Sequence, residues 1–177
     1  MAQPPVAYQH LVSAFDALPG VGPRAAARLA QFVLRNEAGE RLQQAIASAR
    51  SELQLCQRCY CLSTEMFCTD CSHNTQMPEG RLYVVADLND YAQVSEGKKN
   101  ALFVLHGLLS PASGVGPTDL KLAALRQRVQ QEAPNELILL FSPGVEADAT
   151  EWFIRDMLQG FTVSRQSIEG YLQGDAE

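Results

Sequence analysis

The spacing of apolar residues changes near residue 80, and different secondary structure is expected on either side. Before this point, apolar positions recur at helical spacing, which predicts helices at residues 8–18, 23–35 and 37–55. After it, apolar residues gather in short continuous runs that are typical of buried strands. The predicted strands span residues 81–86, 101–105, 136–141 and 161–164.

The segments between these strands predict helices at residues 87–95, 118–131 and 149–158, the second with Thr118 as its N-cap. Alternating short strands and helices imply a parallel sheet that is covered on both faces. We therefore expect an α/β multidomain protein. Its expected parts are a helical domain at residues 1–54, a cysteine-rich segment at residues 55–77, and an α/β domain at residues 78–177.

All five cysteines lie between residues 56 and 71 in the stretch CQRCYCLSTEMFCTDC. Its two CxxC pairs, separated by eight residues, can supply the four sulfur ligands of a tetrahedral zinc site. We expect one structural Zn²⁺ per chain, bound by Cys56, Cys59, Cys68 and Cys71. Cys61 is interpreted as a spare thiol, and a disulfide or redox pair is the alternative for the cluster. Because so short a segment has almost no apolar core, the metal is expected to supply its folding free energy.

The stretch LPGVGP at residues 18–23 lies between the first two predicted helices. Its glycines allow a tight hairpin, and Pro23 suits the first turn of the next helix. Amides exposed at the N-terminus of that helix, with two arginines four residues apart, form a site for a phosphate group. Such a site would bind the DNA backbone with little sequence preference, although a plain turn between two core helices has the same pattern. The expected DNA-binding residues are Gly20, Val21, Gly22, Arg24 and Arg28.

The charge of the chain is unevenly distributed. The net charge is −6, but residues 1–53 carry five arginines against four acids, whereas residues 78–177 carry eight basic against fourteen acidic residues. One end of the chain is therefore suited to polyanions and the other to basic proteins. We expect no membrane segment and no signal peptide, and hence a cytoplasmic location.

The order of these motifs resembles the bacterial RecR family of recombination mediators. The resemblance rests on LPGVGPRAAARLA, on CxxC-x8-CxxC, and on an α/β domain that contains VLHGLLSPASGVGP, and it covers roughly residues 8–170. It implies a helix-hairpin-helix domain, a four-cysteine zinc finger and a Toprim-like (Rossmann-like) domain. It also implies that Arg24 and Arg28 contact DNA.

The resemblance further implies a role rather than a catalytic activity. RecR-like proteins act in DNA repair with RecO and RecF, and help to load RecA onto DNA coated by single-strand-binding protein. A homo-oligomer, either a dimer or a tetrameric ring, and an association with the nucleoid are expected. The alternative is a zinc-stapled adaptor that binds proteins but not DNA.

The chain resembles a divergent and C-terminally short member of this family. It has Ala86-Asp87 where the family has two acids, and Ile168-Glu169-Gly170-Tyr171 where the family has Arg-Gly-Leu-Pro. It also stops before the family's C-terminal extension, so we expect a dimer through the hairpin domains more than a full ring.

A Toprim nuclease or primase is the less favoured alternative. Toprim catalysis needs a glutamate as general acid/base and an Asp-x-Asp pair for Mg²⁺. The corresponding positions here are Ala86 and Ser142-Pro143-Gly144, so we expect no enzyme. The acidic residues Glu146, Asp148 and Glu151 are instead expected to contact a basic surface of RecO.

Overall fold

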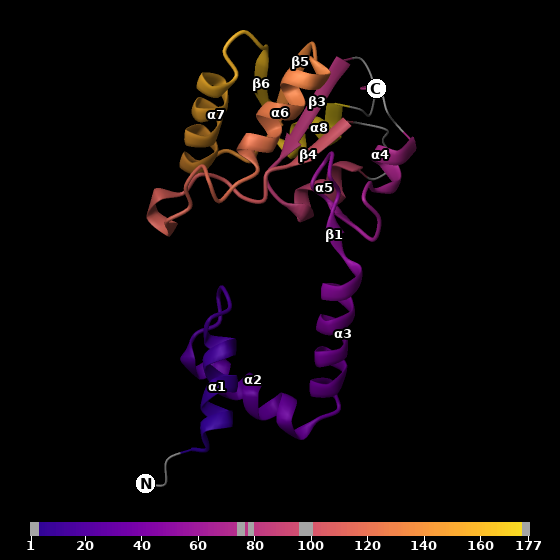
Figure 1. Ribbon diagram of the computed structural model, residues 1–177. Coiled ribbons are helices and arrows are strands. Elements are labelled where there is room, and N and C mark those ends of the chain that lie inside the picture. Colours follow the sequence, from indigo (N-terminus) through magenta and orange to yellow (C-terminus); the bar gives the residue numbers. More distant parts are fainter. Residues whose placement is uncertain (1–3, 74–76, 78–79, 96–100, 175–177) are drawn as a thin grey trace. The chain divides into compact units, whose positions relative to one another are not determined.

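The structure is a computed structural model that describes residues 4–73, 77, 80–95 and 101–174. The chain divides into two compact units, residues 1–52 and 53–177. Figure 1 shows the elements of each. No helix in the described ranges is both long enough and apolar enough to cross a membrane.

The first unit consists of three helices, α1 (Val6–Asp16), α2 (Pro23–Arg35) and α3 (Ala38–Glu52). Small side chains allow α2 to pack closely on its neighbours: Ala26 and Ala30 are fully buried. At the start of α3, a Cβ added to Gly39 would lie 2.1 Å from the Val33 carbonyl oxygen, so only glycine fits there. The three helices thus approach one another closely at Ala26, Ala30 and Gly39, and few large apolar side chains are buried between them.

The second unit is built on a four-stranded parallel sheet. Its strands are β3 (Arg81–Val85), β4 (Ala101–Val104), β5 (Glu136–Leu140) and β6 (Val163–Gln166), in the order β4-β3-β5-β6. A short antiparallel pair, β1 (Gln54–Leu55) and β2 (Leu62–Ser63), precedes the sheet, followed by α4 (Thr69–His73). The expected parallel sheet is confirmed.

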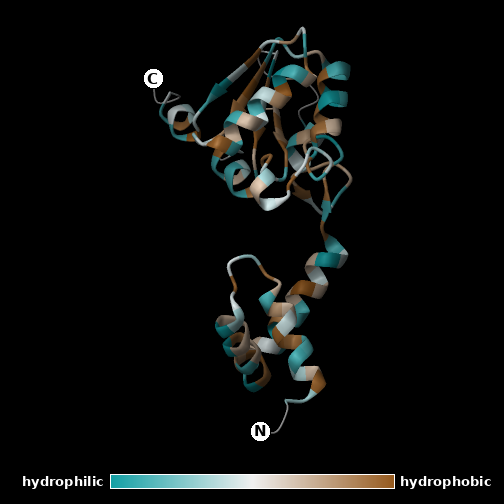
Figure 2. Ribbon diagram, turned by 90° about the vertical axis from the view of Figure 1, so that its left-hand side faces the viewer, coloured by the Kyte–Doolittle hydropathy of each residue, from teal (hydrophilic) through white to brown (hydrophobic). Residues whose placement is uncertain are grey.

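Each face of the sheet has its own apolar core because alternate strand residues point to opposite sides. On one face, Leu82, Phe103 and Leu139 pack with residues of α6 (Leu122–Glu132) and α7 (Val145–Met157). On the other, Val85 and Leu140 pack with residues of α5 (Leu88–Ser95), α8 (Ile168–Gly174) and the cysteine segment. Figure 2 shows these apolar strands in brown within the second unit.

Several predicted boundaries are wrong. The helix expected from Thr118 begins at Leu122, because residues 118–121 form a turn in which Lys121 N–H donates to the Leu105 carbonyl. Helix α7 begins at Val145 rather than at residue 149, and β6 lies two residues later than expected. The helix predicted for residues 37–55 ends at Glu52, where the chain turns into β1. Helices α4 and α8 were not predicted.

Candidate metal centre and nucleic-acid interface

The four cysteines of the two CxxC pairs converge on one point. The sulfur atoms of Cys56, Cys59, Cys68 and Cys71 all lie within 4.8 Å of one another. Among the described residues, this is the one group of three or more His, Cys, Asp or Glu side chains with such geometry. Four converging sulfur atoms, three of them buried, form a closed donor set that fits a tetrahedral Zn²⁺ and leaves no position open for substrate.

Local backbone hydrogen bonds shape this cluster. Cys56 N–H donates to the Cys61 carbonyl (2.8 Å), and Tyr60 N–H donates to the Cys56 carbonyl (3.0 Å), closing a tight turn in which Tyr60 has a positive φ of 62°. The Cys68 N–H points at the Cys56 sulfur, 3.4 Å away.

The thiols influence one another's ionisation even without a metal. A hydrogen bond from Cys59 lowers the pKa of Cys71 to about 6, and burial raises the pKa of Cys68 to about 12. All five cysteines are free thiols in the structure, so the disulfide alternative has no support there. Of the four cysteines, Cys71 thus has a lowered pKa, whereas the pKa values of Cys59 and Cys68 are raised.

Cys61 is close to this cluster but is not one of the four. It is buried, and its sulfur lies 3.3 Å from that of Cys59. It belongs to the same turn as the first CxxC pair, and its carbonyl accepts the Cys56 N–H. Its interpretation as a spare thiol remains a prediction.

The cysteine segment does have a core, contrary to expectation. Its buried cysteines belong to the same apolar cluster as Val85, Leu102 and Val104 of the sheet. Backbone contacts reinforce this packing, since Val104 N–H donates to the Cys59 carbonyl at 2.8 Å. The segment folds against the α/β sheet, and compact unit two includes both.

Two further side chains tie the segment to the sheet. His106 Nε2 donates to the Tyr60 carbonyl at 2.7 Å. Arg128 of α6 is buried and donates through Nη1 to the carbonyls of Leu102 (2.7 Å) and Arg58 (3.2 Å). In the sequence, Arg128 is a charged residue in a helical segment with periodic leucines, and nothing in this pattern indicates that its side chain is buried and bonded to backbone carbonyls.

Glu132 balances the two arginines at this junction. It accepts from Arg58 Nε at 2.8 Å and from Arg128 Nε at 3.2 Å. Burial by itself would raise the pKa of Glu132, but the hydrogen bond from Arg58 and the two positive charges lower it overall. The carboxylate is therefore held ionised beside two largely buried cations.

The hairpin between α1 and α2 forms as expected, with one difference. Gly20 has a φ of 77°, in the left-handed region that favours glycine, and Gly22 is the N-cap of α2 with Pro23 at its first position. Val21 N–H donates to the Leu18 carbonyl at 3.1 Å, so this amide is already used within the turn. Gly22 N–H has no hydrogen-bond partner among the described residues.

Arg24 and Arg28 lie one helical turn apart and are exposed. Neither has an ion-pair partner in the described ranges. The Gly22 amide, the positive end of the α2 dipole and the two exposed guanidinium groups form an arrangement that is suited to an anion such as a phosphate.

The three acidic residues expected to face a partner lie on α7. Glu146 has no ion pair among the described residues, whereas Asp148 and Glu151 both bind Arg165, at 2.5 Å and 3.2 Å. Glu151 also pairs with Arg155 at 2.8 Å. The structure thus brings the three carboxylates onto one helix, but two of them are already partly neutralised.

The strand ends that hold the metal in a catalytic Toprim site have other roles here. The Ala86 carbonyl accepts from Gly107 N–H, and the Asp87 carboxylate caps α5 by accepting from the amides of Asn89 and Asp90 at 2.8 and 2.9 Å. At the end of β5, residues 142–144 carry no carboxylate.

Comparisons with known proteins agree with this combination of motifs. A family model described as "RecR, helix-hairpin-helix" matches residues 8–50. The chain is 38% identical to recombination protein RecR of Prochlorococcus marinus (strain MIT 9303) over 88% of its length and 84% of the relative's. It is 35% identical to RecR of Amoebophilus asiaticus, covering 90% and 82%, and 36% identical to RecR of Gloeothece citriformis, covering 100% and 90%. Identity at this level over nearly the full length of both chains shows that the protein belongs to the RecR family of recombination proteins.

Proposed function

We propose that this member of the RecR family is a DNA-binding mediator that acts with RecO and RecF to load RecA onto DNA coated by single-strand-binding protein. Its role in recombination and repair follows from the family. The observation that carries the DNA-binding part is the hairpin, where a free amide and two unpaired arginines surround one helix N-terminus. The protein acts by binding rather than by turnover, in the cytoplasm and at the nucleoid.

One hairpin offers only one or two phosphate contacts, so a single subunit would bind DNA weakly. Oligomerisation raises the effective concentration of the second contact. The first unit supports such an assembly: an apolar groove of about 610 Å³ runs beside Leu11, Phe15, Leu42 and Ile46. Exposed apolar surface of this kind marks a protein contact, and we assign it to a homo-oligomer through the hairpin domains, a dimer or a tetrameric ring.

The metal part of the proposal is one structural Zn²⁺ per chain, with Cys56, Cys59, Cys68 and Cys71 as ligands. The converging sulfur atoms support this assignment. The partner part is that the carboxylates of Glu146, Asp148 and Glu151 face a basic surface of RecO. The net negative charge of α7 supports it.

The deciding experiment is a salt titration of DNA binding with Arg24→Ala/Arg28→Ala. We expect affinity to fall about equally for every DNA sequence, and the salt dependence to flatten by about one ion per lost contact. The matched control is Arg35→Ala/Arg50→Ala, which removes the same charge from exposed positions at the end of α2 and on α3. Equal binding by the first variant and the parent would favour the adaptor that binds only proteins.

A further inference from the structure

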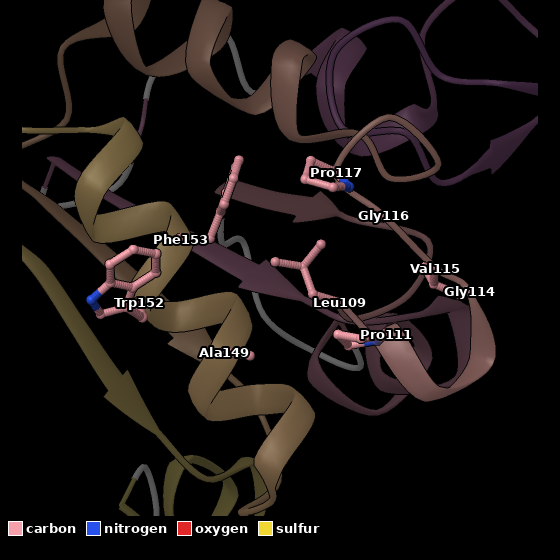
Figure 3. Close-up of a pocket in the computed structure, with 9 residues that line it drawn as sticks. All are labelled: Leu109, Pro111, Gly114, Val115, Gly116, Pro117, Ala149, Trp152 and Phe153. Atoms are coloured by element: carbon pink, nitrogen blue, oxygen red, sulfur yellow. The ribbon is translucent and has the colours of Figure 1, made fainter.

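An apolar groove lies between the loop after β4 and helix α7, the helix that carries Glu146, Asp148 and Glu151. Its volume is about 520 Å³. Figure 3 shows Ala149, Trp152 and Phe153 on α7 at one side and the loop that carries Pro111 and Pro117 at the other, with Leu109 between them. All nine residues that line the groove are apolar or glycine.

The groove is preformed. Thr150 of α7 is fully buried, accepts the Leu109 N–H at 2.9 Å and donates to the Glu146 carbonyl at 2.7 Å, so one hydroxyl ties the loop to the helix. Within the loop, Ser110 and Val115 exchange two backbone hydrogen bonds of 3.1 and 2.9 Å. A ligand would therefore meet walls that are already in place, which reduces the entropic cost of binding.

One wall of the groove is strongly exposed. Trp152 is 70% accessible and Val145, two helical turns before it on the same face, is 85% accessible. Tryptophan carries a large share of binding energy where it lies in protein interfaces, and its exposure beside an apolar groove indicates a surface that another molecule covers.

The surrounding charges identify the occupant. Helix α7 carries four carboxylates against one arginine, and residues 107–117 carry no charge. Glu146 has no ion pair in the described part of the chain. A polyanion such as DNA is disfavoured here, and the same face of a second copy would bring carboxylates together. A basic partner is complementary.

We propose that this groove binds a cationic amphipathic segment of a partner protein. One apolar side chain of that segment lies in the groove against Trp152 and Leu109, and its Lys or Arg residues meet the carboxylates of α7. The inference deepens the partner site proposed above and rests on that proposal only for the identity of the partner as RecO.

Trp152 provides the measurement, because it is the chain's single tryptophan. The full-length protein labelled with 5-fluorotryptophan gives one ¹⁹F signal from this residue. Three synthetic peptides of equal length are titrated: one of Leu and Lys at helical spacing, one in which Ser replaces Leu, and one in which Glu replaces Lys. We expect the ¹⁹F signal to shift only with the Leu/Lys peptide.

Variants then separate the groove from general charge attraction. By fluorescence anisotropy of the labelled Leu/Lys peptide, Trp152→Ala should weaken binding at least tenfold, and Trp152→Phe should restore most of it. The matched control is Leu172→Ala, an exposed apolar residue of α8 outside the groove, which should leave affinity unchanged. Equal binding of the Leu/Lys and Ser/Lys peptides, or of the Trp152→Ala variant and the parent, would overturn the inference.

Purified RecO forms a separate arm of the experiment. Loss of RecO affinity in Trp152→Ala, but not in Leu172→Ala, supports both the groove and the partner. If the parent protein binds the Leu/Lys peptide through Trp152 but does not bind RecO, the proposed partner is wrong and the groove stands. If RecO binds the parent and Trp152→Ala with equal affinity, RecO docks elsewhere and the groove is rejected as its site.

Discussion

The two units of this protein bury their apolar residues to very different extents. The second unit has two extensive cores, one on each face of the sheet, with leucines, valines and phenylalanines almost fully buried. In the first unit, the only buried residues among those described are Ala26 and Ala30, whereas Phe32, Leu34 and Ile46 are at least half exposed. The second unit thus has cores of its own, while the first leaves most of its apolar side chains at least partly exposed. We therefore expect the stability of the second unit to come from packing and the proposed metal, and that of the first unit from the proposed assembly.

Removal of the proposed metal should cause the largest loss of stability, and it should affect the second unit. Structural Zn²⁺ contributes roughly 10–16 kcal/mol of apparent binding free energy in small zinc modules at pH 7. We therefore expect Cys56→Ser to lose the metal and to lower the unfolding temperature of the second unit sharply, while Cys61→Ser retains it. Metal content by elemental analysis, with thermal unfolding, checks both. Metal loss in Cys61→Ser with retention in Cys56→Ser would contradict the ligand assignment.

Acid should have the same effect as a lost ligand. Zinc binds thiolates, so protons compete with the metal and its affinity falls as the pH falls. Elemental analysis after dialysis at decreasing pH should show zinc release, and refolding at neutral pH with Zn²⁺ should restore it.

Disruption of the groove in the first unit should have the next largest effect. Ile46→Asp places a carboxylate in an apolar surface, and we expect a lower mass in sedimentation and an unfolding midpoint that no longer depends on protein concentration. If assembly stabilises this unit at a concentration 100 times its dissociation constant, the loss is about 2.7 kcal/mol. Glu52→Asp, at the end of α3, is the control. An unchanged mass would place the oligomer contact elsewhere.

Glu132→Gln tests the charged junction between the cysteine segment and α6. The variant leaves Arg58 and the buried Arg128 without a carboxylate, and we expect a loss of about 2 kcal/mol at neutral pH, less than for a fully buried pair because Glu132 is partly exposed. Since the folded-state pKa of Glu132 lies below its ordinary value of 4.5, its contribution is present above that pH and disappears as the pH falls through the lower folded value. Denaturant unfolding of both proteins at several pH values should therefore converge in acid.

Ser110→Ala should have the smallest effect, with the opposite sign. The Ser110 hydroxyl is buried and has no hydrogen-bond partner among the described residues. Its removal relieves a desolvation cost, so we expect a gain of about 1 kcal/mol or less. A clear destabilisation in denaturant unfolding would show that this hydroxyl does have a partner in solution.

The sequence predicted β3, β4 and β5 well, because each is a largely apolar run whose length matches a buried strand, whereas β6 is only partly apolar and lies two residues later than expected. It predicted less well where tertiary contacts decide. Thr118 looks like an N-cap, yet the Lys121 amide is held by the Leu105 carbonyl, and α6 starts only after it. Helix α8 is short and owes its place to packing of Ile168 and Tyr171 on the sheet.

The same distinction applies to the sites. Paired CxxC spacing and the hairpin signature are local in sequence, so the residues that build them could be named in advance. The groove beside Trp152 joins segments some forty residues apart through the buried Thr150 hydroxyl, and no local pattern shows that contact. Even within the hairpin, the hydrogen bond from the Val21 amide to the Leu18 carbonyl depends on turn geometry that the composition does not specify.

The contact between the cysteine turn and β4 has a consequence for solubility. β4 lies at one margin of the sheet, where the outward backbone groups of an unprotected strand would template pairing with another molecule. Here the outward Val104 N–H is taken by the Cys59 carbonyl, and the outward Leu102 carbonyl is taken by Arg128. The cysteine turn therefore also covers the edge strand of the sheet. If the turn holds the proposed metal, we expect the metal-free chain to aggregate through β4 before the rest of the sheet unfolds.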